Sequence, residues 1–465
     1  MQVTAPRRNS APYNPKYDPI RDRSIGHGSA YAPTYWIGTA GTPPEDDGPV
    51  RQDMDVDVVV IGSGYTGLSC ALHLAKEFGI KAHVLEANGV AYGCSTRNGG
   101  QAQISSGRLK RSQWIERWGL DIAKGMHAEV TEAFALFRGL IADHNIDCDP
   151  QDGGHYYIAH KPWMMPALEK ESALLRETFG YGAKLLSRGD VHDRVARDAE
   201  AQGAMWEPDG VGIHAAKLAF GYMRAARELG AKIHVDSPVE SWETKNGIHH
   251  LRTPGGTVRA RAVAVATAGY APRSLHPRLR DRIMPIMSNS ITTRVLTASE
   301  LEACGFQTRS PLTDTRTLRH YYRLLPDNRV QIGSRAAITG SDADNPKHLA
   351  SLREGLARKF PALRGIPLDY SWWGWVDVSH DMMPRITAMP GTPNAYYAMG
   401  YGGNGVMYAA QAGRRMAQLV AGRAADIPKL PIFGDELPHE GWKTPFRRLG
   451  QWGLYKLYHY RDERG

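Results

Sequence analysis

The sequence predicts an α/β fold (α+β overall), in which a discontinuous nucleotide-binding domain on a mostly parallel sheet joins a second domain with a mixed or antiparallel sheet. Three patterns lead to this prediction. A strand, a glycine turn, a helix and a second strand follow one another over residues 55–86. A strand, a glycine loop and a helix recur over residues 395–421. Between them, residues 281–369 contain alternating segments that are typical of antiparallel strands.

The first pattern has the order of elements that a Rossmann-like βαβ unit requires. An apolar strand ends in the turn Gly62-Ser63-Gly64-Tyr65-Thr66-Gly67, and an amphipathic helix follows. The first glycine permits the tight turn, the second lets a pyrophosphate approach the backbone, and the third lets the helix pack closely. The helix N-terminus offers N–H groups to phosphates. At the end of the second strand, Glu86 can accept hydrogen bonds from ribose hydroxyls.

A second glycine-rich segment, Gly93-Cys94-Ser95-Thr96-Arg97-Asn98-Gly99-Gly100-Gln101, follows that strand. Its glycines are unsuited to a helix or a strand, so a loop is predicted. A loop with many backbone donors at this point of a nucleotide-binding fold can surround a phosphate or a polar ring edge. We therefore interpret it as a ligand-binding loop.

Composition limits the class of protein. The chain has 465 residues, 42% of them apolar, which is enough for a large core and about two domains. It has no run of eighteen apolar residues, and no apolar segment follows Arg7 and Arg8, so neither a transmembrane segment nor a secretory signal is expected. Four cysteines lack metal-like spacing, which indicates reduced thiols and a cytoplasmic protein. The net charge of +9 is dispersed, so no specific nucleic-acid partner is expected.

The order of elements predicts how the chain divides. Residues 1–52 are expected to form an N-terminal arm on the body, anchored by Tyr31, Tyr35 and Trp36. The nucleotide-binding domain is predicted from three segments, 53–115, 210–280 and 370–430. The second domain takes 116–209 and 281–369, with a hairpin at 320–333, and a basic aromatic tail takes 431–465. Helices are predicted at 112–145, 162–179, 214–229, 349–360 and 406–421, and strands at 154–160, 232–235, 262–267, 290–296 and 395–399.

The second glycine loop determines which nucleotide is expected. The strand Ala395–Met399 leads into Gly400-Tyr401-Gly402-Gly403-Asn404-Gly405, and a long helix begins near Val406. Two glycine loops, each at a helix N-terminus, suggest one long ligand that is contacted at both ends. A nicotinamide cofactor needs only the first of them, whereas FAD extends from an adenosine pocket to a buried ring. FAD is therefore the predicted cofactor.

These motifs resemble those of the FAD-dependent amine oxidoreductases of the D-amino-acid oxidase superfamily, in the branch that contains sarcosine oxidase, glycine oxidase and γ-glutamylputrescine oxidoreductase. Four segments carry the resemblance: DVVVIGSGYTGLSCALHLA with Glu86, GCSTRNGGQ, YYRLLPDNRVQIGSR, and YAMGYGGNGVMYAAQAGRRMAQLVAG. They lie within residues 55–421, so the resemblance covers most of the chain. It implies hydride transfer from the carbon beside an amine nitrogen to the flavin, after which the imine hydrolyses. Such chemistry needs placement and desolvation more than acid–base groups, and no metal site is expected.

The resemblance also implies roles for individual residues. The first glycine turn would hold the pyrophosphate, Glu86 and Ala87 the adenosine ribose, and Val239 the adenine edge. Loop residues Ser95 to Gln101 would contact the flavin and the far phosphate, and the second glycine loop the pyrimidine end of the ring. The predicted cofactor-binding residues are Gly62, Ser63, Gly64, Tyr65, Thr66, Gly67, Glu86, Ala87, Ser95, Thr96, Arg97, Asn98, Gly99, Gly100, Gln101, Val239, Gly269, Gly402, Gly403, Asn404, Gly405, Val406 and Met407.

The sequence also departs from the sarcosine oxidase pattern. Sarcosine-type members attach the flavin to a cysteine near residues 373–381, but no cysteine follows Cys304, so non-covalent FAD is predicted. Met407 stands where those members have a substrate-binding lysine. Gln331 is the residue nearest to the position at which those members have a lysine that promotes the reaction with oxygen. The electron acceptor is accordingly expected to be O2 or another carrier.

Candidate substrate residues lie on the hairpin and after the tryptophan-rich segment. Alternation along a strand means that either Tyr322, or Tyr321 with Arg323, faces the cavity. Arg335 can bind a carboxylate through two hydrogen bonds. The predicted catalytic residues are Tyr322, Arg335 and His380; His320 is a further candidate base, and Asp377 and Asp381 are candidates for capping turns or binding an amine cation.

The favoured function is oxidation of a small-molecule amine or N-substituted amino acid, with a dicarboxylate suggested by the arginines. The alternative is a tRNA-modifying or membrane-docked flavoprotein that uses its basic surface or its C-terminal tail.

Overall fold

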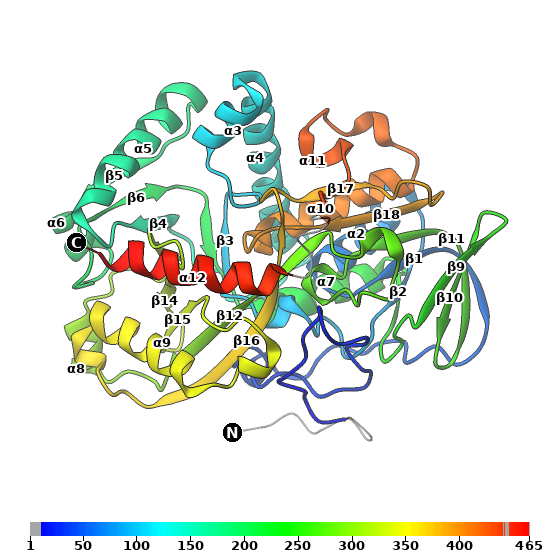
Figure 1. Cartoon of the computed structure of the whole chain (residues 1–465), viewed down its shortest axis with the longest axis horizontal. Helices are drawn as coiled ribbons and strands as arrows, with labels where there is room; N and C mark the ends of the chain where they lie inside the picture. The colour runs from blue at the N-terminus through cyan, green and yellow to red at the C-terminus, as the bar shows by residue number, and fades with distance from the viewer. Residues whose placement is uncertain (1–10, 440, 442–445, 465) are drawn as a thin grey trace.

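The computed structural model describes residues 11–439, 441 and 446–464. Residues 1–10 of the predicted arm, and residues 440, 442–445 and 465 of the predicted tail, lie outside the described part. Two eight-stranded sheets form the two halves of the molecule. Figure 1 shows the first sheet on the right with α2, α7 and α10, and the second on the left with α5 and α9.

The first sheet has the strand order β17-β18-β11-β1-β2-β8, and β10 and β9 extend it beside β11. The strands from β18 to β8 run parallel to one another, whereas β17, β10 and β9 pair with their neighbours in antiparallel fashion. Its strands are β1 (Met54–Ile61), β2 (His83–Leu85), β8 (Lys232–His234), β9 (Ser241–Lys245), β10 (Ile248–Thr253), β11 (Gly256–Val265), β17 (Arg385–Ala388) and β18 (Ala395–Met399).

The second sheet has the order β16-β12-β15-β14-β13-β4-β6-β5 and is mixed, because only β13 and β4 pair in parallel. Its strands are β4 (His155–Ile158), β5 (Lys184–Ser187), β6 (Gly203–Glu207), β12 (Ile283–Thr293), β13 (Leu312–Asp314), β14 (Tyr321–Leu324), β15 (Val330–Ser334) and β16 (Leu368–Ser379). The predicted domain boundary at residue 370 cuts through β16, so it does not match a boundary between the sheets. A small third sheet pairs β3 (Gln101–Gln103) with β7 (Gly210–Gly212).

Helices form in all five segments where the apolar periodicity predicts them, and further helices form in segments where none was predicted. The predicted helix 112–145 is divided at Gly119, whose φ is +82°, into α3 and α4. The described helices are α1 (Tyr35–Thr39), α2 (Tyr65–Phe78), α3 (Arg111–Trp118), α4 (Leu120–Asp143), α5 (Met165–Phe179), α6 (Arg188–Arg194), α7 (Ala215–Glu228), α8 (Ala298–Cys304), α9 (Pro346–Lys359), α10 (Gly405–Val420), α11 (Pro431–Gly434) and α12 (Arg447–Glu463).

The C-terminal helix α12 joins distant parts of the chain (Figure 1, red). Arg448 near its start donates to the carbonyl of Pro285 at 2.9 Å. Near its end, Asp462 accepts from the backbone N–H of Thr317 at 2.8 Å, and Glu463 forms an ion pair with Arg316. Its outer side leaves large apolar side chains exposed, among them Leu449, Trp452 and Leu457. Among the described residues, no helix combines the length and apolar character that crossing a bilayer requires.

Candidate active site

A cavity of about 570 Å³ is lined by both glycine loops and by the loop that follows β2. This volume is typical of a site for a small molecule or cofactor. Helices α2 and α10 both begin at its wall, so two helix N-termini contribute positive partial charge. Residues from the antiparallel sheet, including Ser288, Thr313 and Tyr321, also line it.

The first glycine turn is shaped so that few other residues would fit. Gly62 has φ +100°, and a Cβ added there would lie 2.8 Å from the carbonyl oxygen of Ala266. A Cβ on Gly67 would lie 1.9 Å from the carbonyl oxygen of Gly62, so the glycine permits the close approach of α2 to β1. A Cβ on Gly64 would lie 3.1 Å from Ser95 Oγ. This turn keeps the cavity wall open to a phosphate group.

Glu86 is buried beside this turn. Its carboxylate accepts hydrogen bonds from Ser63 N at 3.0 Å, from Ser63 Oγ at 2.8 Å and from Asn88 N at 3.1 Å. Burial raises the pKa of Glu86, while these donors act in the opposite direction. Ser63 therefore orients Glu86 instead of lining the cavity itself.

The loop after β2 is held from both sides. The indole of Trp36 on α1 donates to the carbonyl of Asn98 at 2.7 Å, and that of Trp372 on β16 donates to the carbonyl of Arg97 at 2.8 Å. The N-terminal segment therefore packs on the ligand loop, which agrees with the predicted anchoring by Trp36. The Arg97 guanidinium lies among tyrosine rings, including that of Tyr92 at 4.8 Å.

The second glycine loop is organised by Asp377, at the end of β16. Its Oδ2 accepts from Gly400 N at 2.6 Å, and its main-chain carbonyl accepts from Gly402 N at 2.7 Å. Burial raises the pKa of the Asp377 carboxyl to about 6, although the backbone donors oppose this effect. Asn404 is fixed separately, because its Oδ1 accepts from Gln103 Nε2 at 2.6 Å.

The two glycine loops are held at one cavity by the packing of α2 against α10. Ser69 Oγ donates to the carbonyl of Ala410 at 2.7 Å, and the hydroxyls of Thr66 and Tyr401 lie 2.8 Å apart. Gly413 allows this approach, because a Cβ there would lie 2.6 Å from the carbonyl oxygen of Thr66.

Most predicted cofactor residues line this cavity. Those that do are Gly62, Gly64, Tyr65, Thr66, Glu86, Ala87, Ser95, Arg97, Asn98, Gly99, Gln101, Val239, Gly402, Gly403, Asn404, Gly405 and Val406. The others each adjoin a lining residue in sequence without lining the cavity themselves: Ser63, Gly67, Thr96, Gly100, Gly269 and Met407.

The predicted catalytic residues are placed differently from one another. Arg335 lines the cavity, but Tyr322 does not, because it lies on the opposite face of β14 and its hydroxyl donates to Asp198. Tyr321 takes the expected place, with its hydroxyl 2.7 Å from Ser290 Oγ. His380 is also outside the lining, where its ring lies 3.3 Å from the carbonyl of Asp281. Of the three predicted catalytic residues, therefore, only Arg335 lines this cavity in the described part of the chain.

Sequence reasoning missed several lining residues. Arg23, Ser24, Ile25 and His27 of the N-terminal segment line the cavity. Arg108 and Arg319 also line it, and neither lies in a motif. Only their convergence in three dimensions marks them, so no local pattern could have identified them.

The structure and the known proteins agree on the family. The family model for DAO, FAD-dependent oxidoreductases, matches residues 57–419. The chain belongs to this DAO family. It is 32% identical to γ-glutamylputrescine oxidoreductase of Escherichia coli K12 over 409 residues, which cover 86% of this chain and 92% of that protein. It is 26% identical to sarcosine oxidase subunit beta of Rhizobium meliloti over 370 residues, 75% of this chain and 80% of that protein.

Solved structures agree on the fold. Glycine oxidase from Geobacillus kaustophilus superposes with a TM-score of 0.68 at 20% identity, over 82% of this chain and 98% of that one. The enzyme is therefore an FAD-dependent oxidoreductase that acts on amine or amino-acid donors. The cavity fits FAD, because glycines keep both ends open where a Cβ would meet backbone or side-chain atoms, and because two helix N-termini face it.

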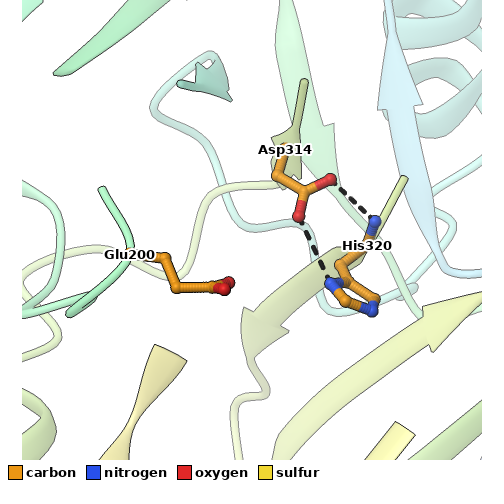
Figure 2. Close-up of side chains that lie close together, drawn as sticks. All are labelled: Glu200, Asp314 and His320. Carbon is orange, nitrogen blue, oxygen red and sulfur yellow. Dashed lines mark hydrogen bonds and ion pairs between the residues drawn. The ribbon is translucent and has the colours of Figure 1, made fainter. Parts of the chain in front are cut away.

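A second cluster of titratable residues in this DAO-family enzyme resembles a metal site. Glu200, Asp314 and His320 bring their ligand atoms within 4.8 Å of one another (Figure 2). However, Lys359 Nζ lies 3.2 Å from Asp314 and 3.3 Å from Glu200, and also 3.5 Å from Asp198. Burial alone would raise the pKa of Asp314, but the ammonium of Lys359 and the ring of His320 hold it well below its usual range. Arg316 also pairs with Asp314 and, at 2.7 Å, with Glu200. The cluster is thus a buried ion-pair network whose cations are Lys359 and Arg316.

Lys359→Met should lower the free energy of unfolding by about 3–5 kcal/mol, because the buried carboxylates would lose one of their counter-charges and Arg316 would remain beside Asp314. Urea unfolding followed by circular dichroism measures this change. Lys347→Met is the matched control, since that exposed lysine pairs with Asp342 and its loss should cost less than about 1 kcal/mol. A change below about 1 kcal/mol in the Lys359 variant would contradict the network.

Asp377→Asn should become more stable relative to the wild type as the pH rises. Asparagine can still accept from Gly400 N, but it cannot ionise. The pKa of Asp377 is raised in the fold, so its favourable contribution is complete below pH 3.8 and is lost as the pH rises through about 6. Thermal melts of the holoenzyme between about pH 4 and pH 7 measure the difference. Asp57→Asn, at an exposed ion pair, is the control; a pH-independent difference at Asp377 would refute this assignment.

Proposed function

We propose that this enzyme oxidises the C–N bond of a secondary amine or an N-substituted amino acid. The observation that carries the proposal is that one cavity is lined both by the two glycine loops and by Tyr321 and Arg335, which belong to the β14–β15 hairpin region of the second sheet. FAD, when bound, would accept a hydride from the carbon beside the amine nitrogen, and the imine that remains would hydrolyse in water.

The residues that would hold FAD follow from the lining. Gly62, Gly64 and the start of α2 would receive the pyrophosphate, and Glu86 the ribose. Val239 would lie at the adenine end, and Gly402 to Val406 at the pyrimidine end of the ring. At that end the N-terminus of α10 would stabilise negative charge.

The chain's own residues would mainly position the substrate and exclude water. Among the described residues, Arg335 donates to one acceptor, the carbonyl of Gly402 at 3.4 Å, so its guanidinium can receive a substrate carboxylate. The Tyr321 hydroxyl is oriented by Ser288 and Ser290, at 2.9 and 2.7 Å. Placement of the donor carbon by such groups supplies much of the rate enhancement in hydride transfer.

The flavin is proposed to be non-covalent. Cys94 is the thiol among the described lining residues, and burial raises its pKa to about 12, which keeps it protonated and a weak nucleophile. No lysine of the described residues lines the cavity, and Gln331 is buried on β15 outside the lining. The proposed electron acceptor is therefore O2 or another carrier, and re-oxidation rates distinguish these two.

Anaerobic mixing with amines tests the proposed function. Secondary amines, N-methyl amino acids and γ-glutamylputrescine, a compound in the name of the E. coli relative, should be screened for bleaching of the flavin absorbance. At least one class should reduce the flavin fully, and acid precipitation of the holoenzyme should release all flavin into the supernatant. Air is then admitted and re-oxidation is timed. A flavin that stays oxidised with every amine would refute the function, and flavin that stays with the precipitate would refute non-covalent binding.

A further inference from the structure

Three arginines line the cavity, and two of them contact the second glycine loop. The three are Arg108, Arg319 and Arg335. Arg108 Nη1 and Arg335 Nη2 both approach the carbonyl oxygen of Gly402, at 3.5 and 3.4 Å. Both side chains also pack on the loop itself, because an added Cβ on Gly402 would lie 2.6 Å from Arg108 Cγ and one on Gly403 2.8 Å from Arg335 Nη2.

These arginines lack a counter-ion within the described part of the chain. No described carboxylate lies within 4.0 Å of any of the three guanidinium groups, in contrast to Arg111, which pairs with Glu207, or Arg316. The Nε atoms of Arg319 and Arg335 are buried and have no hydrogen-bond partner among the described residues. Buried charges and donors without partners are costly, and they are usually satisfied by an ion or a ligand.

The acids of the cavity are engaged elsewhere. Glu86 accepts from Ser63, Asp377 accepts from Gly400, and Glu240 pairs with Arg252 at 3.7 Å.

The three cations repel one another strongly. Arg335, together with burial and Arg319, lowers the pKa of Arg108 well below its usual range. Burial, with a further contribution from Arg319, lowers the pKa of Arg335 to about 10. A single carboxylate would leave two of the three positive charges without compensation, whereas two carboxylates would compensate most of the charge.

We propose that Arg108, Arg319 and Arg335 form a binding site for a substrate that carries two carboxylates. One carboxylate would lie between Arg108 and Arg335, which share the Gly402 carbonyl, and the second would pair with Arg319. Bidentate geometry suits arginine for this role. The hydroxyls of Ser288, Thr313 and Tyr321 line the same cavity and add neutral donors. The inference rests on the proposed function, because the substrate would be the amine that is oxidised, and it narrows that amine to a dicarboxylic N-substituted amino acid or amino acid.

Binding of inert ligands tests the site without turnover. Glutarate and glutaramate have nearly the same shape but carry two charges and one charge, respectively. Each is titrated into the oxidised holoenzyme while the flavin absorbance and the melting temperature are followed. Glutarate should bind at least about tenfold more tightly, and the advantage should shrink in high salt. Equal affinity would overturn the proposal, and tighter binding of inorganic phosphate than of glutarate would assign the arginines to a phosphate group instead.

Variants separate a binding role from a structural one. Arg108→Gln and Arg319→Gln should each weaken glutarate binding by about tenfold or more and leave glutaramate binding much less affected. Without ligand, each variant should melt at the same temperature as the wild type or higher, because repulsion is relieved. Arg261→Gln, at an exposed ion pair with Asp57, is the control. If the melting temperature of a variant falls while its affinity for glutarate is unchanged, the arginine has a structural role and the proposed site is refuted.

Turnover distinguishes this inference from the proposed function. N-methylglutamate and N-methylglutamine differ in the charge of one side-chain group. Under anaerobic conditions the first should reduce the flavin at a concentration about tenfold lower than the second, and Arg319→Gln should reduce this preference. Reduction of the flavin by both compounds with equal affinity would refute the two-carboxylate site and retain amine oxidation. Tight glutarate binding with no reduction by any amine would retain the site and refute amine oxidation.

Discussion

The packing of α2 against α10 is the interaction on which the cavity depends. Each helix begins at a glycine loop, and the two loops lie far apart in the sequence. The contact of Gly413 with the backbone around Thr66 holds the two helix N-termini at the walls of one cavity. If the helices moved apart, each loop would remain a local turn, but the shared site would be lost. Close backbone packing therefore positions the cofactor site before any polar contact is made.

The second constraint is electrostatic. Two helix N-termini, and three arginines that have no acidic partner in the described part of the chain, give this cavity a positive potential, while its acids are held by backbone and side-chain donors. Such an arrangement destabilises the protein without ligand and favours anionic ligands. Elsewhere the same chain neutralises its buried charges, as the Lys359 network does. The contrast between the two clusters supports our proposal that the arginines form a binding site and not a structural network.

Much of the fold could be predicted from the sequence, because the relevant signals are local. The βαβ unit, the strand Ala395–Met399 and the helix after it follow from apolar periodicity and glycine position, and Val239 was found through the resemblance to the family. The face of β14 could not be predicted, since alternation allows either Tyr321 or Tyr322 to point into the cavity. That choice is made by pairing with β15 and β13, which brings Tyr322 to Asp198. Pairing between distant strands likewise joins β16, which contains residue 370, to β12 in the second sheet.

The convergence of Arg108 with Arg319 is a property of tertiary structure, and so is the contribution of Arg23 to the lining. The domain division, the individual roles of the site residues and the substrate remain predictions.

The FAD affinity of Gly413→Ala tests directly whether the packing of α2 against α10 assembles the cofactor site. The added methyl group would lie 2.6 Å from the Thr66 carbonyl oxygen and 2.7 Å from Cys70 N, so α2 and α10 would have to separate. FAD should bind to this variant at least about tenfold more weakly, with the secondary structure retained. Gly139→Ala is the control, because nothing lies within 4 Å of a Cβ at that position on α4. Unchanged FAD affinity in Gly413→Ala would contradict the claim that this helix contact assembles the site.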